Sequence, residues 1–89
     1  MKTICYWIYA ISSEKTRRIY VGMSKDVTKR VREHNLGRVF STKGYRPWRL
    51  IYKEKCGINR GDTRKKEKYL KSGVGKEFLN QIDSPVAQR

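Results

Sequence analysis

The sequence predicts an α/β protein of the α+β type, with a small three-stranded antiparallel sheet flanked by helices in the order β-β-α-β-α-α. Three observations predict this fold. Residues 4–11 are apolar or aromatic at every position, which is typical of a strand covered on both faces and therefore central in its sheet. A polar turn at residues 12–16 leads into a returning strand at 17–22. Helical periodicity then appears in three later segments.

The first two strands are expected to form a β-hairpin. If its turn closes around Glu14 and Lys15, Tyr9 lies directly opposite Tyr20 on one face of the sheet. That register follows from the assumed length of the turn.

A basic helix is predicted over residues 25–36, with Ser24 as N-cap and Gly37 as its stop. At about 100° per residue, Val27 and Val31 form its buried stripe.

Two polar residues of this helix, Arg30 and His34, fall beside the buried stripe. The remaining charged residues are expected to point elsewhere: Lys25, Lys29, Arg32 and Glu33. A guanidinium that leans toward a core needs a partner that offsets its desolvation, and a phosphate is the expected partner.

The third strand is predicted from residue 48 onward. Trp48, Leu50 and Tyr52 alternate along it, so it should bury mostly one face and lie at an edge of the sheet.

Two more helices complete the domain. One is expected to begin at residue 62 or 63 and to end near 72, with Gly73 as its stop, and the other spans residues 76–82. One face of the first of them carries Thr63, Glu67 and Leu70.

The length fits one domain, expected over residues 1–83, followed by a frayed tail at 84–89. Lys and Arg number 22 against 8 Asp and Glu, a formal net charge of +14. Because these bases are interleaved with aromatic residues, the composition favours nucleic acid over a membrane surface as the partner. Cys5 and Cys56 lie in no metal-ligand spacing and are expected to be reduced thiols of a cytoplasmic protein.

Five residues have a type and placement that the fold alone does not require: Tyr9, Tyr20, Arg30, His34 and Glu67. Phosphodiester hydrolysis needs a positioned water, stabilisation of the charge that develops in the transition state, and usually a hard cation held by a carboxylate. This set could provide all three.

The ordered set resembles the GIY-YIG endonuclease family, and most closely its small single-domain members. The residues that carry the resemblance are Trp7-Ile8-Tyr9, Tyr20-Val21-Gly22, Arg30, His34-Asn35, Ser41-Thr42, Pro47 and Lys66-Glu67-Lys68. The match covers residues 6–79, which is nearly the whole chain.

The resemblance implies a role for each of the five residues. Tyr9 and Tyr20 would line the site, with Tyr9 as general base. Arg30 would hold the scissile phosphate, His34 would form a hydrogen bond nearby, and Glu67 would bind one Mg²⁺ or Mn²⁺. Because a free tyrosine has a pKa of about 10, the base role requires nearby cationic groups to lower that pKa.

The sequence departs from the family pattern at two positions. Trp7 replaces the first glycine, and Met23 stands where some members have a lysine, a function that Lys25 could take over. Asn80 either matches an asparagine that many members have late in the domain or belongs to the surface of a capping helix.

The predicted substrate is DNA, including single-stranded or branched DNA, cleaved with little sequence specificity because no element remains to read bases. RNA is compatible with the same charge. The residues expected to bind the substrate are Lys25, Arg38, Ser41, Thr42, Lys43 and Arg46. A partner protein could supply specificity, and the expected setting is DNA repair or recombination.

The alternative function is a nucleic-acid-binding module without catalysis, and a third is an RNA-binding protein, for which the sequence has no recognition signature. Glu67 could simply pair with Lys71 at i,i+4, which is worth about 0.3–0.5 kcal/mol. Catalysis is favoured because a lone carboxylate in a basic groove repels phosphate and gives a pure binding module no advantage.

Overall fold

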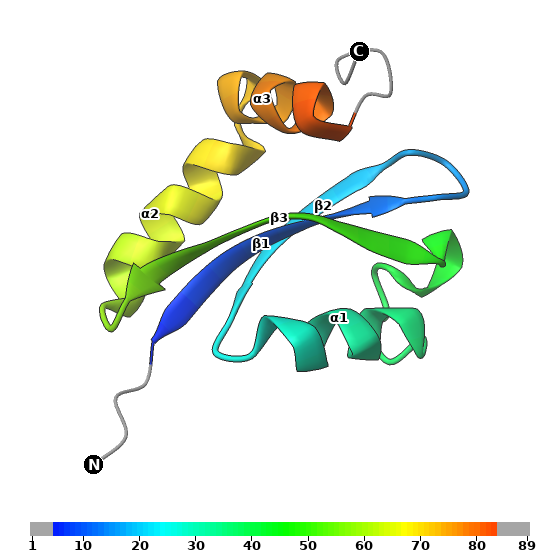
Figure 1. The fold of residues 1–89 in the computed structure, drawn as a ribbon, viewed down its shortest axis with the longest axis horizontal. Coiled ribbons are helices and arrows are strands. Elements are labelled where there is room, and N and C mark those ends of the chain that lie inside the picture. Colours follow the sequence, from blue (N-terminus) through cyan, green and yellow to red (C-terminus); the bar gives the residue numbers. More distant parts are fainter. Residues whose placement is uncertain (1–4, 84–89) are drawn as a thin grey trace.

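The computed structural model describes residues 5–83 and confirms the predicted fold. Its sheet has the strand order β2-β1-β3, and both pairings are antiparallel. The elements are β1 (Tyr6–Ser13), β2 (Ile19–Ser24), α1 (Val27–Asn35), the 3₁₀ turn η1 (Lys43–Tyr45), β3 (Trp48–Gly57), α2 (Arg60–Lys71) and α3 (Gly73–Asp83). Figure 1 shows the sheet between α1 on one side and the α2–α3 pair on the other.

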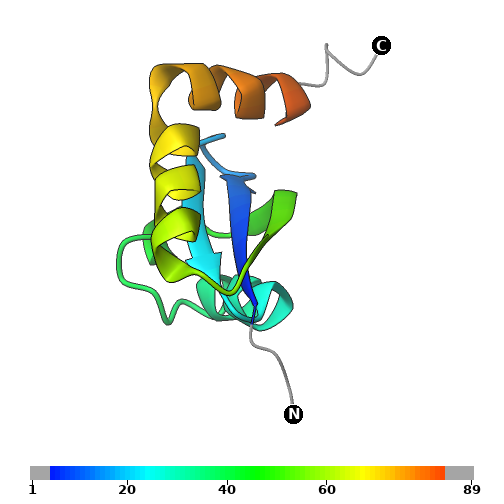
Figure 2. The same ribbon diagram turned by 90° about the vertical axis from the view of Figure 1, so that its left-hand side faces the viewer.

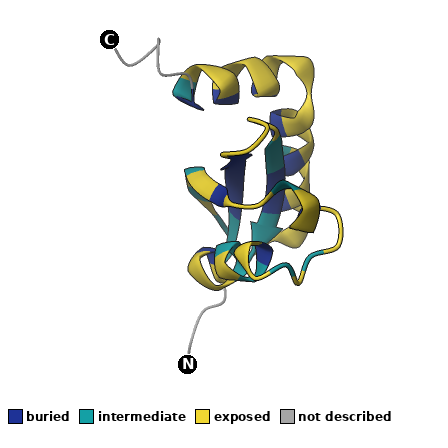
Figure 3. Cartoon of the chain, turned by 90° about the vertical axis from the view of Figure 1, so that its right-hand side faces the viewer, coloured by how far each residue is buried: buried dark blue, intermediate teal, exposed yellow. Residues whose placement is uncertain are grey.

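The central strand β1 contributes to the core on both of its faces, as its sequence predicts. Ile8 and Ala10 pack with residues of α2 and α3, whereas Tyr9 and Ile11 pack with α1 and the start of β3. All four residues are at most 1% exposed. Burial is accordingly concentrated in the sheet, while the outer faces of the helices are exposed (Figure 3).

The expected hairpin register is wrong. Tyr9 lies opposite Gly22, and Tyr20 lies opposite Ile11. The turn is longer than assumed, because the Ser13 N–H donates to the carbonyl of Arg18 across it. The two tyrosines are therefore diagonal neighbours on one face rather than a direct pair.

The strand β3 lies at the edge of the sheet, but its side chains do not alternate regularly between the two faces. A register shift between Ala10 and Ile11 accompanies a bulge, since Tyr52 pairs with Ala10 and Leu50 pairs with Ile11. Trp48 consequently packs on the α1 side and Tyr52 on the α2–α3 side, while Leu50 is 39% exposed.

The boundaries of α1 differ from the expected range 25–36 at both ends, and mainly at the start. Asp26, not Ser24, is the N-cap, because its carboxylate accepts from the Lys29 N–H at 3.0 Å. Ser24 instead accepts from the Asp26 N–H within the preceding turn. At the other end Gly37 has φ +79°, which confirms it as the residue that ends the helix.

The two C-terminal helices are longer than expected and almost continuous. α2 begins after Asn59, whose side chain caps it by accepting from the Asp62 N–H. Gly73 follows Ser72, the C-cap of α2, as expected of a stop, and it is also the first residue of α3. Gly75 decides how closely the helices approach, because a Cβ there would lie 2.3 Å from the Tyr69 carbonyl oxygen and 2.4 Å from the Leu70 Cα.

The loop between α1 and β3 is tied to both elements. Asn35 and Trp48 exchange two hydrogen bonds, from Trp48 N–H to the amide oxygen and from the amide nitrogen to the Trp48 carbonyl. The Trp48 indole N–H also donates to the carbonyl of Thr42. These bonds fix the loop beside the sheet.

Within residues 5–83, Cys5 and Cys56 are free thiols, and none of the helices has the length and apolar character needed to cross a membrane. The tail expected at residues 84–89 lies outside the described residues.

We expect Gly75→Ala to lower the free energy of unfolding by about 1–3 kcal/mol, because the added methyl group meets backbone atoms that cannot rotate away. Gly73→Ala, where nothing lies within 4 Å of the added methyl, is the matched control and should be close to neutral. Urea unfolding of both variants measures the difference. Equal midpoints would contradict this account of the helix packing.

Candidate active site

The structure brings together the five residues singled out in the sequence from four elements: Tyr9 from β1, Tyr20 from β2, Arg30 and His34 from α1, and Glu67 from α2. The ring centroid of Tyr20 lies 6.4 Å from that of Tyr9 and 5.0 Å from that of His34. Glu67 lies close enough to Tyr9 for its charge to affect the pKa of the phenol. Figure 2 shows why α2 can contribute, since it runs alongside the edge strand β2.

A buried chain of hydrogen bonds links the sheet, the helix and the following loop. The Tyr9 hydroxyl lies 2.8 Å from His34 Nε2, and His34 Nδ1 lies 2.8 Å from the Thr42 hydroxyl oxygen. The Thr42 hydroxyl itself donates to the carbonyl of Val39. This network assigns the proton of His34 to Nδ1, so that Nε2 accepts from the Tyr9 hydroxyl.

Gly22 is required by the position of Tyr9. A Cβ at Gly22 would lie 2.8 Å from the Tyr9 hydroxyl oxygen and 3.0 Å from the Tyr20 ring. The glycine of the second tripeptide therefore makes room for both phenols beside the backbone of β2.

Burial determines the protonation states of Tyr9 and His34 in this chain of hydrogen bonds. It raises the pKa of Tyr9 to about 12, and Tyr20 adds to the shift while Arg30 opposes it. Burial also lowers the pKa of His34 to about 4, and the charge of Arg30 acts in the same direction. The role of Tyr9 as general base was expected to require cationic groups that lower its pKa. In the protein alone the pKa of Tyr9 is raised instead.

Arg30 lies at the boundary between the core and solvent. Its side chain is 39% exposed, and its guanidinium donates to the Glu33 carboxylate at 2.9 Å. Glu33 was expected to point away from Arg30, but it holds the guanidinium in place and raises its pKa. The i,i+3 spacing of the two residues was the sequence signal for this pair.

Glu67 is buried although its neighbours are cations. The residue is 8% exposed, whereas the side chains that approach it, Lys71 and Arg64, are more than half exposed. Lys71 Nζ lies 3.1 Å from Oε2, so the i,i+4 pair considered from the sequence exists. Arg64 is 3.7 Å from Oε1, and this buried oxygen has no hydrogen-bond partner.

This buried oxygen, which has no hydrogen-bond partner, fits a hard divalent cation. No group of three or more His, Cys, Asp or Glu side chains suitable for a metal occurs in residues 5–83. A cation held by Glu67 would complete its coordination with water and substrate phosphate oxygens, as Mg²⁺ commonly does.

The residues expected to bind substrate fall into two groups. Thr42 is buried and positions His34, whereas the others lie at or near the surface: Lys25, Arg38, Ser41, Lys43 and Arg46. Lys25 and Arg30 line a common depression of about 370 Å³ beside the start of α1, which fits Lys25 replacing the lysine absent at Met23. Asn80 lines a second groove together with Tyr20.

We expect the stability of the protein to fall as the pH decreases from about 6.5 toward 4. His34 is neutral in the folded state, with its pKa lowered to about 4, while the unfolded chain binds a proton below about 6.5. The stabilisation that comes from the neutral state of His34 is therefore complete above about pH 6.5 and is lost as the pH falls toward 4. Thermal midpoints from pH 7.5 to 4.5 should show a flatter dependence for His34→Gln than for the wild type. Parallel curves would contradict the buried, neutral state of His34.

Comparison with known proteins identifies the family of this chain. The sequence pattern of the GIY-YIG catalytic domain matches residues 5–80. A structure-specific endonuclease subunit SLX1 homolog from Giardia intestinalis is 38% identical over 50 residues, which are 53% of this chain and 14% of that protein. The chain thus matches only a small part of this relative. Because the family match extends over most of the sequence, the chain belongs to the GIY-YIG nuclease family.

Proposed function

We propose that this protein is a metal-dependent endonuclease that hydrolyses DNA phosphodiester bonds, with one Mg²⁺ or Mn²⁺ ion, a tyrosine general base and little sequence specificity. The observation that carries the proposal is the buried Glu67 carboxylate near Tyr9, with one oxygen left without a hydrogen-bond partner. An ion pair on a helix surface does not need to be buried, whereas a buried carboxylate oxygen without a hydrogen-bond partner costs free energy unless a ligand binds to it.

Proton transfer can proceed although the pKa of Tyr9 is high. The Tyr9 hydroxyl donates to His34 Nε2, so an oxygen lone pair of Tyr9 is available to accept a proton from the attacking water. As that proton arrives, the original phenol proton can pass to His34. Because the pKa of His34 is about 4, this second transfer is unfavourable alone, and the two transfers would be concerted. No free tyrosinate is required.

Arg30 would bind the scissile phosphate. Its half-exposed guanidinium keeps donor groups beyond those used by Glu33, and planar guanidinium groups suit phosphate oxygens. When bound at Glu67, a divalent cation would supply further positive charge to the phosphate.

The substrate is proposed to be DNA with single-stranded or branched structure. The net charge of +14 favours contacts with phosphates, and the Giardia relative is named a structure-specific endonuclease subunit. The word subunit also agrees with a partner protein that directs the nuclease. A role in DNA repair or recombination would follow from such a substrate.

A non-catalytic nucleic-acid-binding module is the second candidate. The ion pair of Glu67 with Lys71 is the observation in its favour, since it gives the carboxylate a structural role. Two substitutions separate the candidates.

Arg30→Ala should reduce cleavage by about 10²-fold or more, because the phosphate loses a charged donor in the transition state. The fold should be retained, since the Arg30 side chain is 39% exposed and does not fill the core. Arg32→Ala, on the exposed face of α1, is the control. Cleavage rates and circular dichroism of both variants test this role, and an unfolded Arg30→Ala protein would indicate that Arg30 is structural.

Glu67→Gln keeps the shape of the side chain and removes its charge. We expect metal-dependent cleavage to be lost, while affinity for DNA in EDTA is equal or higher because a repulsive carboxylate is gone. Glu77→Gln, at an exposed position of α3, should change neither property. Cleavage by Glu67→Gln at the wild-type rate would refute the single-metal site, and weaker binding in EDTA would refute the argument from repulsion.

A further inference from the structure

A groove beside the active site has no role in the chemistry described above. It has a volume of about 680 Å³ and lies between the β1–β2 turn, the loop after α1 and the helix α3. Tyr20 and Thr42 line both this groove and the active site, so the two are continuous. The volume lies within the range of sites that hold small organic molecules, about 300–1,000 Å³.

The charged residues that line the groove are all cationic: Arg17, Arg18 and Lys76. The depression on the other side of the site differs, because Asp26 and Glu33 offset two of its three bases. Within residues 5–83, no acidic side chain forms an ion pair with any of the three groove cations. The groove therefore has an uncompensated positive charge that suits a phosphate chain.

Arg17 occupies a backbone conformation that disfavours it. Its φ is +63°, and in the described part of the chain it is the one residue other than glycine with positive φ. Such a conformation is unfavourable for a residue with a Cβ atom, and glycine or asparagine adopts it more readily. An arginine at a strained turn position beside a cationic groove points to a function of its side chain.

The groove also offers surfaces for stacking. The Arg18 guanidinium lies 4.6 Å from the centroid of the Tyr45 ring, and both residues line the groove. Nucleic-acid bases stack on aromatic rings and on guanidinium planes, but only where they are unpaired. A duplex exposes no such base faces.

We propose that this groove binds the unpaired DNA strand that flanks the scissile phosphate. The proposal rests on the proposed function and extends it, because it assigns a single-stranded flank to the substrate. Arg17 and Lys76 contact the phosphates of this strand, and the Arg18–Tyr45 pair stacks with its bases.

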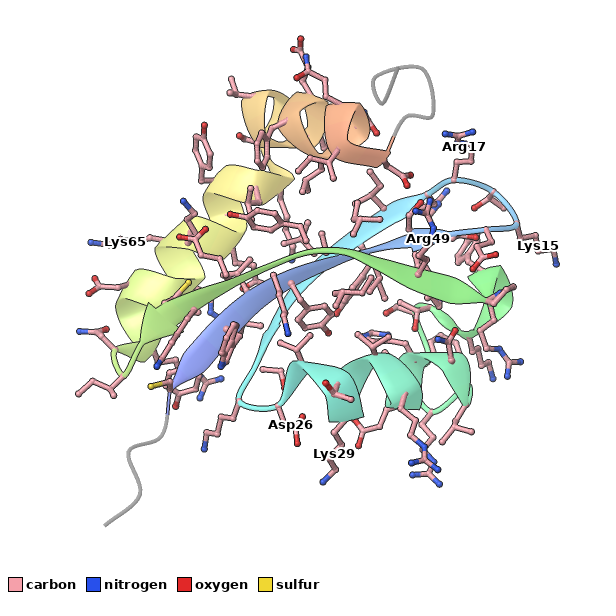
Figure 4. All side chains as sticks on the ribbon, viewed as in Figure 1. Lys15, Arg17, Asp26, Lys29, Arg49 and Lys65 are labelled. Carbon is pink, nitrogen blue, oxygen red and sulfur yellow. The ribbon has the colours of Figure 1, made fainter. Side chains whose placement is uncertain are left out.

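The test compares binding of labelled single-stranded and duplex oligonucleotides by fluorescence anisotropy in EDTA. The variants are Arg17→Asn, which suits the positive φ, and Lys76→Gln, at an exposed position of α3. Lys65→Gln is the control, since Lys65 lies on α2 at the far end of the molecule from Arg17 (Figure 4).

Combining the two groove substitutions should weaken single-strand binding by on the order of tenfold and reduce the salt slope by about 1.4. Binding of duplex DNA and the Lys65→Gln control should change less than about twofold, and the thermal midpoint of Arg17→Asn should not fall. An equal loss for duplex DNA or for the control would overturn the proposal, as would unchanged single-strand binding. Binding is measured without metal and so does not depend on cleavage. If the wild type does not cleave DNA but the groove substitutions still weaken single-strand binding, only the nuclease function is refuted.

Discussion

The hydrogen bond between Tyr9 and His34 is the interaction on which the rest of the site depends. Both side chains are at most 1% exposed, so each would leave an unsatisfied polar atom in the core without the other, at a cost of about 1–3 kcal/mol. Thr42 completes the chain from the loop after α1. The same contacts that pack α1 against the sheet therefore set the position and protonation of the residues proposed for catalysis.

This arrangement explains how a small domain can form an active site without a separate cleft between domains. Tyr9 and His34 occupy the layer between the sheet and α1, whereas Glu67 comes from α2, which packs mainly on the other side. The two sides meet at the edge strand β2, where Gly22 lacks a side chain that would block the phenols. A substrate strand lying along this edge would contact the depression beside Arg30, the tyrosines and the cationic groove in succession.

The fold and the central strand could be predicted from the sequence, because hydrophobic periodicity is a local signal. The order of the motifs indicated which five polar residues lie close together, and their roles in catalysis stay proposals. The hairpin register could not be predicted, because it depends on Arg17 adopting a positive φ that its residue type disfavours. The bulge in β3 could not be predicted either, because Trp48, Leu50 and Tyr52 alternate regularly in the sequence. The direction of the Tyr9 pKa shift was missed because it results from burial by residues distant in sequence.

The central claim is that these residues form a hydrolytic site rather than a binding surface alone. The most direct measurement is incubation of the wild-type chain with end-labelled single-stranded, duplex and branched DNA, in Mg²⁺ and in EDTA. We predict incision in Mg²⁺ of substrates that contain an unpaired strand and none in EDTA. Tight binding of all three DNAs by a folded protein, with no incision of any of them in Mg²⁺ or Mn²⁺, would contradict the account.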